Sequence, residues 1–150
     1  MKYIYKKPYF LFLALVTILF VVVLANCEKR LILNIHDTYF VVSYVDFGLF
    51  LSFIYSLIGL IYYAFIRLNF SLIKWMTAVH VIISIGGLFL VCGFFLLIRE
   101  APSSDLKSFL RNINFNSNMN LGILISFICI IGTQMLFVAN GIQALINGKV

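Results

Sequence analysis

Four long runs without Asp, Glu, Lys or Arg constrain the fold of this chain more than any other feature. They cover residues 8–27, 38–66 with Asp46 as the single interruption, 75–98, and 112–148, where the apolar part begins near Leu121. Each can supply the roughly 20 apolar residues that a helix needs to cross the hydrocarbon core of a bilayer. None alternates apolar and polar residues with period two, as the strands of a membrane β-barrel do.

These runs predict an all-α integral membrane protein with four transmembrane helices packed as a bundle. Helices are expected because exposed backbone polar groups cannot be left unsatisfied in lipid. We place the spans at about 8–27, 38–66, 75–98 and 121–146, in a single transmembrane domain that covers residues 1–150. Residues 99–120, with Pro102 and five asparagines, are expected to form a polar surface loop.

The composition excludes an ordinary water-soluble domain and a nucleic-acid-binding protein. Of the residues, 63% are hydrophobic and 11% are charged, whereas soluble domains carry about a quarter charged residues. The formal net charge is +6, but the basic residues occur in ones and twos and form no stripe that could follow a phosphate backbone. The expected partners are therefore the lipid bilayer and other membrane subunits.

The distribution of basic residues predicts that both termini are cytoplasmic. Four spans place the termini on one side, which carries six Lys or Arg residues against five on the other. The terminal side has Lys2, Lys6, Lys7, Arg67, Lys74 and Lys149, and the opposite side has Lys29, Arg30, Arg99, Lys107 and Arg111.

The first span has an alternative interpretation as a lipoprotein signal, because it follows three lysines and ends at Cys27. Asn26 does not fit the small residue expected before the modified cysteine, and the apolar run exceeds the usual signal core of about 7–15 residues. We therefore predict that the segment is retained as a membrane helix.

Asp46 is the most unusual residue in the predicted spans. It lies nine residues after Asp37, about 13 Å along a helix that begins there, and a charged group at such a depth is costly. Three interpretations remain open: a proton-relay or ion site, a neutral buried acid that donates a hydrogen bond, and a residue that faces another helix.

Other polar residues in the spans are expected to pack helices together. His80 is interpreted as a hydrogen-bonded packing residue in preference to a metal ligand. Gly86 and Gly87 allow close helix approach, and side-chain amides on the last span are suited to interhelical hydrogen bonds. These amides belong to Gln134, Asn140 and Gln143.

The dipeptide His36-Asp37 precedes the second predicted span and has two interpretations. Imidazole and carboxylate groups can ligate a divalent cation such as Mg²⁺ or Mn²⁺. An aspartate at a helix start can instead accept hydrogen bonds from free backbone N–H groups as an N-cap. The residues alone favour the cap.

Two segments, Val22-Val23-Leu24-Ala25-Asn26 and His36-Asp37-Thr38-Tyr39-Phe40-Val41-Val42, resemble subunit I of the haem-copper oxidases, the catalytic subunit of cytochrome c oxidase. Val79-His80, with Gly87 seven residues after the histidine, extends the similarity. The resemblance covers essentially the whole chain, as the last four of the family's twelve helices.

The resemblance implies that the catalytic function has been lost. Tyr44 and Asp46 stand at the two positions where the family has its iron-ligating histidines, and the copper ligands lie in helices without a counterpart here. The positions of His36 and Asp37 match residues that help bind Mg or Mn in the family. Haem and copper are therefore not expected, no catalytic residue is assigned, and the chain by itself is not expected to be an enzyme.

The resulting hypothesis is a haem-free, oxidase subunit I-like protein that acts as a structural or accessory subunit of a membrane complex, such as a respiratory one. Two alternatives remain: a proton- or ion-conducting module that uses Asp46, and a fragment of a split oxidase.

Overall fold

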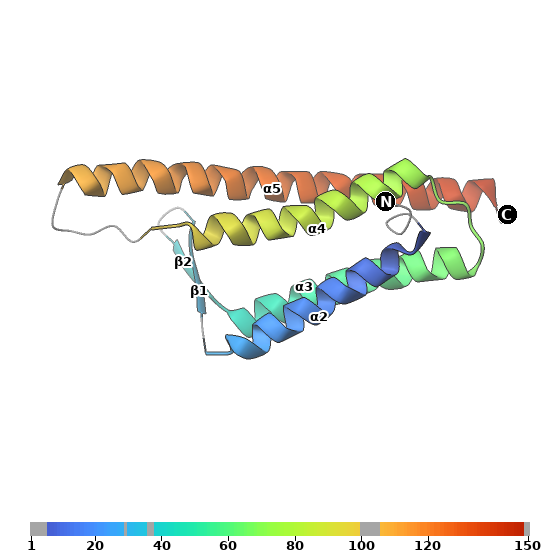
Figure 1. Cartoon of the computed structure of the whole chain (residues 1–150), viewed down its shortest axis with the longest axis horizontal. Coiled ribbons are helices and arrows are strands. Elements are labelled where there is room, and N and C mark those ends of the chain that lie inside the picture. The colour runs from blue at the N-terminus through green and yellow to red at the C-terminus, as the bar shows by residue number, and fades with distance from the viewer. Residues whose placement is uncertain (1–5, 29, 36–37, 100–105, 149–150) are drawn as a thin grey trace. The chain divides into compact units, whose positions relative to one another are not determined.

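The computed structural model describes residues 6–28, 30–35, 38–99 and 106–148 of the chain. Its elements, labelled as in Figure 1, are α2 (Pro8–Ala25), β1 (Arg30–Ile35), β2 (Thr38–Ser43), α3 (Tyr44–Arg67), α4 (Lys74–Leu96) and α5 (Leu106–Asn147). The chain divides into two compact units, residues 1–72 with 147–150 and residues 73–146. The first unit holds α2, both strands and α3, and the second holds α4 and nearly all of α5.

The four helices confirm the all-α, four-helix part of the prediction. They contain 18, 24, 23 and 42 residues, and each is long and apolar enough to cross a membrane. The predicted spans 8–27 and 75–98 agree with α2 and α4 to within two residues at each end. The chain thus has the helices of a multi-pass membrane protein.

The second predicted span begins too early, because residues 38–43 form a strand. In the two-stranded antiparallel sheet Arg30 pairs with Ser43 and Ile35 with Thr38. Both strands are rich in the β-branched and aromatic residues that favour extended backbone. α3 starts at Tyr44, where the Ser43 hydroxyl accepts a hydrogen bond of 3.1 Å from the backbone N–H of Val45 and so caps the helix.

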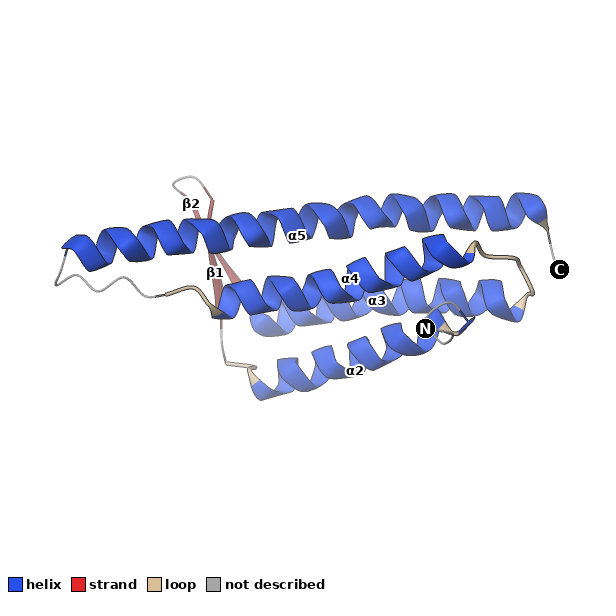
Figure 2. Cartoon of the chain, turned by 45° about the horizontal axis from the view of Figure 1, so that its top comes forward, coloured by secondary structure: helices blue, strands red, loops and turns tan. Residues whose placement is uncertain are grey.

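The predicted polar loop at 99–120 is also wrong over most of its length, because α5 begins at Leu106. The 42 residues of α5 extend about 63 Å at about 1.5 Å per residue, roughly twice the thickness of a hydrocarbon core. Figure 2 shows α5 continuing well past the end of α4. The start of α5 therefore reaches beyond the length that a bilayer core covers.

Aromatic residues and a glycine pack α2 against α3. The ring of Phe12 stacks on Tyr55 and Tyr62, with centroid separations of 6.0 and 5.8 Å. Near the other end of the pair, a Cβ added at Gly48 would collide with the side chain of Val23. A small residue at this position lets the two backbones approach closely, as is usual between helices in lipid.

The C-terminal end of α3 is closed by a Schellman motif. Asn69 has a positive φ of 59°, and its N–H donates to the Ile66 carbonyl at 3.2 Å. The Phe70 N–H donates to the Phe65 carbonyl at 2.9 Å, and the two phenyl rings lie 5.7 Å apart, edge to face. The paired hydrogen bonds and the hydrophobic contact are those expected of this helix ending, so the position of Asn69 beside the last turn of α3 is well defined.

Candidate functional site

A column of polar side chains joins α4 to α5 inside their apolar segments. On α4 the polar residues recur every three or four positions, so they share one face of the helix. All but Gln134 are at most 4% exposed. We call this set the polar ladder: Thr77, His80 and Ser84 on α4, and Thr133, Gln134 and Asn140 on α5.

Asn140 binds the N-terminal end of α4. Its Oδ1 accepts a hydrogen bond of 2.8 Å from the backbone N–H of Ile73, the residue just before the helix. Its Nδ2 donates to Thr77 Oγ1 at 2.9 Å and to the Ile73 carbonyl at 3.4 Å. Ile73 has no polar side chain with which to cap α4 itself, so an amide from the neighbouring helix satisfies backbone groups at this helix end.

The middle of the polar ladder is a connected set of hydrogen bonds around His80. His80 Nε2 lies 3.2 Å from Gln134 Oε1, and Gln134 Nε2 donates to Ser84 Oγ at 3.3 Å. Ser84 Oγ in turn lies 3.4 Å from Thr133 Oγ1. The imidazole also stacks on the ring of Phe137, with centroids 5.0 Å apart. His80 thus packs between two helices through both its ring face and its Nε2 atom.

Gly87 continues the same face of α4 and brings the helices into close contact. A Cβ at this position would lie 2.7 Å from Cγ1 of Ile130 and 3.8 Å from the Ser126 carbonyl oxygen. The neighbouring Gly86 has nothing within 4 Å of such an atom. Of the two adjacent glycines, only Gly87 is required by the packing of α4 on α5.

A second asparagine holds the other end of α4. Asn116 Oδ1 accepts from the Arg99 N–H at 2.9 Å, and Asn116 Nδ2 donates to the Arg99 carbonyl at 2.7 Å. The Arg99 guanidinium lies over the ring of Phe115, 3.9 Å from its centroid. We call Asn116 and Asn140 the asparagine clamps. They are 24 residues apart, about 36 Å along α5.

Chemically, this site is suited to holding two helices in a fixed register. Interhelical hydrogen bonds in membranes contribute about 0.6 kcal/mol each on average, so several together stabilise the pair by a few kcal/mol. Sliding α4 by one helical turn would separate every donor from its acceptor and leave polar groups buried without partners, which is costly. The polar ladder therefore favours one alignment of α4 and α5.

Asp46 lies closer to the end of its span than the sequence predicts. It is the third residue of α3, exposed, and in the first helical turn, where a carboxylate interacts favourably with the helix dipole. The predicted depth is wrong because α3 begins at Tyr44 and not at residue 38. Asp46 lines an open hollow that it shares with Cys27, Glu28, Arg30, Val41 and Ser43, and Tyr44 is half-buried at the start of the helix.

His36 and Asp37, the candidate Mg or Mn ligands, lie outside the described residues. The alternative interpretation of Asp37 as the cap of the second span fails, because that helix is capped by Ser43. Among the described residues, no group of three His, Cys, Asp or Glu side chains could hold a metal ion.

Sequence reasoning found part of the polar ladder and missed the rest. Gln134 and Asn140 make the interhelical hydrogen bonds expected of them, whereas Gln143 is exposed. The sequence places Asn116 in the predicted loop and gives no separate prediction for the hydroxyl residues of the ladder. Their spacing at three or four positions within apolar runs was the available signal.

Comparisons of the chain with known proteins return no match to a family model, to a curated protein or to a solved structure.

Proposed function

We propose that the chain is a haem-free relative of the C-terminal part of oxidase subunit I and serves as a structural or accessory subunit of a membrane complex. The observation that carries the structural role is the polar ladder. Its buried polar groups are engaged with the neighbouring helix, as in a scaffold that holds spanning helices together.

The environment of His80 supports the absence of a haem ligand in α4. Its Nε2 atom is engaged with Gln134, and its ring is stacked on Phe137 with no exposed surface. An axial ligand needs a ring nitrogen that is directed at iron. A histidine held in this way serves packing.

The start of α3 supports the same conclusion. At the two positions that the resemblance relates to iron ligation, the chain has Tyr44 and Asp46, so neither supplies an imidazole. The alternative, a proton- or ion-conducting module that uses Asp46, requires an acid deep in a span. With Asp46 in the first turn of α3, a role in the structural scaffold is the better proposal.

The proposal is tested by deleting the chain in its native host and measuring the assembly of membrane complexes on blue native gels. We expect a larger complex to be lost or destabilised, and to return when either the wild type or Asp46→Asn is expressed. An unaltered set of complexes would contradict the accessory role. Proton or ion flux through proteoliposomes of the purified chain that Asp46→Asn abolishes would instead favour the proton- or ion-conducting module.

A spectrum of the purified chain tests the haem-free part separately. After mild detergent extraction and washing, we expect no Soret absorption band above that of a matched preparation from the deletion strain. A band that survives washing in stoichiometric amount would overturn the proposal.

A further inference from the structure

A small hollow lies where α2 begins and α3 ends, separate from the polar ladder. Five residues line it: Tyr9, Tyr63, Ile66, Arg67 and Asn69. Its volume of about 250 Å³ is below the roughly 300–1,000 Å³ of pockets for drug-sized ligands. The hollow therefore suits one small polar group better than a whole cofactor.

Two features of the fold hold the residues that line the hollow in place. The Schellman motif fixes Asn69 beside the last turn of α3. Tyr63 precedes Arg67 by one helical turn, and its ring meets that of Tyr9 edge to face at 5.4 Å. The residues that line the hollow thus include one arginine, one asparagine and two tyrosines, whose side chains all carry hydrogen-bond donors.

The surroundings of the hollow favour an anion. The positive end of the α2 dipole, at Tyr9, and the negative end of the α3 dipole, at Arg67, meet here and oppose each other. The sign of the site is therefore set by its basic side chains, Arg67 and the exposed Lys6 and Lys7 that come just before α2. All five acidic residues of the chain occur elsewhere in the sequence, in the segments that join α2 to α3 and α4 to α5 or in the first turn of α3: Glu28, Asp37, Asp46, Glu100 and Asp105.

We propose that this hollow binds a phosphate group, supplied by the headgroup of an anionic phospholipid. Arginine binds phosphate oxygens through two parallel hydrogen bonds, and basic pockets beside membrane helices bind anionic headgroups. Both helices reach the hollow at the end of an apolar span, which is the level of lipid phosphates. Two tyrosines at this level are typical of a membrane interface.

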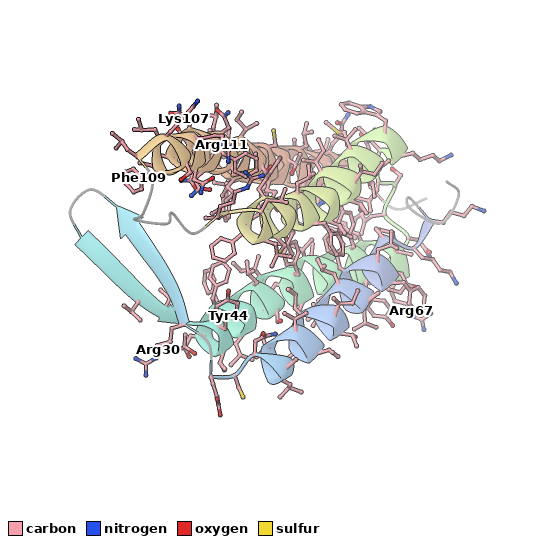
Figure 3. All side chains as sticks on the ribbon, turned by 60° about the vertical axis from the view of Figure 1, so that its left-hand side comes forward. Arg30, Tyr44, Arg67, Lys107, Phe109 and Arg111 are labelled. Carbon is pink, nitrogen blue, oxygen red and sulfur yellow. The ribbon has the colours of Figure 1, made fainter. Side chains whose placement is uncertain are left out.

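The test measures binding of a fluorescent phosphatidylglycerol to the full chain in phosphatidylcholine nanodiscs. Arg67→Gln removes the guanidinium and its parallel hydrogen-bond donors, and it is expected to raise the Kd at least about tenfold, which corresponds to about 1.4 kcal/mol. Arg30→Gln is the matched control, because Arg30 lies at the opposite end of the same unit, as Figure 3 shows. It should leave the Kd within about twofold.

A second variant separates loss of the site from loss of the fold. Asn69→Gly keeps the positive φ that the helix ending requires and removes the amide, so it should fold and still weaken lipid binding severalfold. Equal binding by wild type, Arg67→Gln and Asn69→Gly would overturn the proposal, as would an equal loss in Arg30→Gln.

A third measurement distinguishes a lipid headgroup from free inorganic phosphate as the source of the phosphate group. Inorganic phosphate is added at millimolar concentration to the chain in pure phosphatidylcholine nanodiscs, and thermal stability is followed. We expect no Arg67-dependent rise in Tm. A rise that Arg67→Gln abolishes would retain the phosphate site and overturn the lipid as its source.

Discussion

Replacing Asn140 by alanine tests the polar ladder at the N-terminal end of α4. The substitution removes the hydrogen bonds to the Ile73 N–H at 2.8 Å, to Thr77 Oγ1 at 2.9 Å and to the Ile73 carbonyl at 3.4 Å. Asn140 is 1% exposed, so water does not readily take the place of the lost amide. The Ile73 N–H is then left without its partner.

The magnitude follows from these contacts. Three interhelical hydrogen bonds at about 0.6 kcal/mol each amount to about 2 kcal/mol, and an unsatisfied buried donor costs about 1–3 kcal/mol. The two contributions overlap, because one of the three bonds is the one that satisfies the donor. We therefore expect Asn140→Ala to lower the free energy of unfolding by about 3 kcal/mol.

Unfolding can be followed in mixed micelles as the fraction of a denaturing detergent rises. The chain has one tryptophan, Trp75, which is the second residue of α4 and comes two positions after Ile73, the residue that Asn140 binds. Its fluorescence therefore reports on the helix end under study. Gln143→Ala is the matched control, since Gln143 is an exposed amide less than one turn further along α5.

Two results would refute this reasoning. One is a free energy of unfolding for Asn140→Ala within about 0.5 kcal/mol of the wild type, the range of ordinary surface substitutions. The other is an equal loss in Gln143→Ala. A double-mutant cycle with Thr77→Val should in addition give a coupling energy of about 0.6 kcal/mol, and zero coupling would mean that the hydrogen bond between Asn140 and Thr77 contributes nothing.

Three further predictions use residues with contrasting surroundings. Gly87→Ala should lower the free energy of unfolding by about 1–3 kcal/mol through overpacking. Gly86→Ala is the control and should not lower it. Equal effects of the two substitutions in the micelle assay would contradict the close contact at Gly87. Ser84→Ala should lower the free energy of unfolding by about 1 kcal/mol. Ser52→Ala should leave it unchanged, because Ser52 Oγ is buried without a hydrogen-bond partner among the described residues. A loss of stability in Ser52→Ala as large as that in Ser84→Ala would contradict this prediction. If the termini are cytoplasmic, a membrane-impermeant maleimide should label the exposed Cys27 from outside intact cells, and labelling only after permeabilisation would reverse the orientation.

The existence of four long helices could be predicted because the length of an uninterrupted apolar run can be read directly from the order of residues in the sequence. The start of α3 could not be predicted in the same way, since a charge-free run does not reveal whether its backbone is helical. In residues 38–43 the β-branched and aromatic side chains favour a strand. Pairing with β1 supplies hydrogen-bond partners for the backbone N–H and C=O groups, as a helix would have done. For this reason the sequence predicts Asp46 deeper in the span than the first turn of α3, where it lies.

The start of α5 could not be predicted, because the local sequence there favours a loop although the backbone is helical. Asparagine favours turns and has low helix propensity, so the asparagine-rich segment resembled a loop. The propensity is overridden at Asn116, whose side chain is occupied by the backbone of Arg99. Such a contact between residues 17 positions apart depends on the tertiary arrangement, and no local pattern in the sequence contains it.

The asparagine clamps also determine how the second unit responds to bilayer thickness. Membrane helices adapt to a thinner or thicker bilayer by tilting or kinking, and a helix that is not held could also shift along its neighbour. With one clamp at each end of α4, about 36 Å apart on α5, shifting would break hydrogen bonds at both ends at once. Hydrophobic mismatch is therefore accommodated by tilting α4 and α5 together as a single rod.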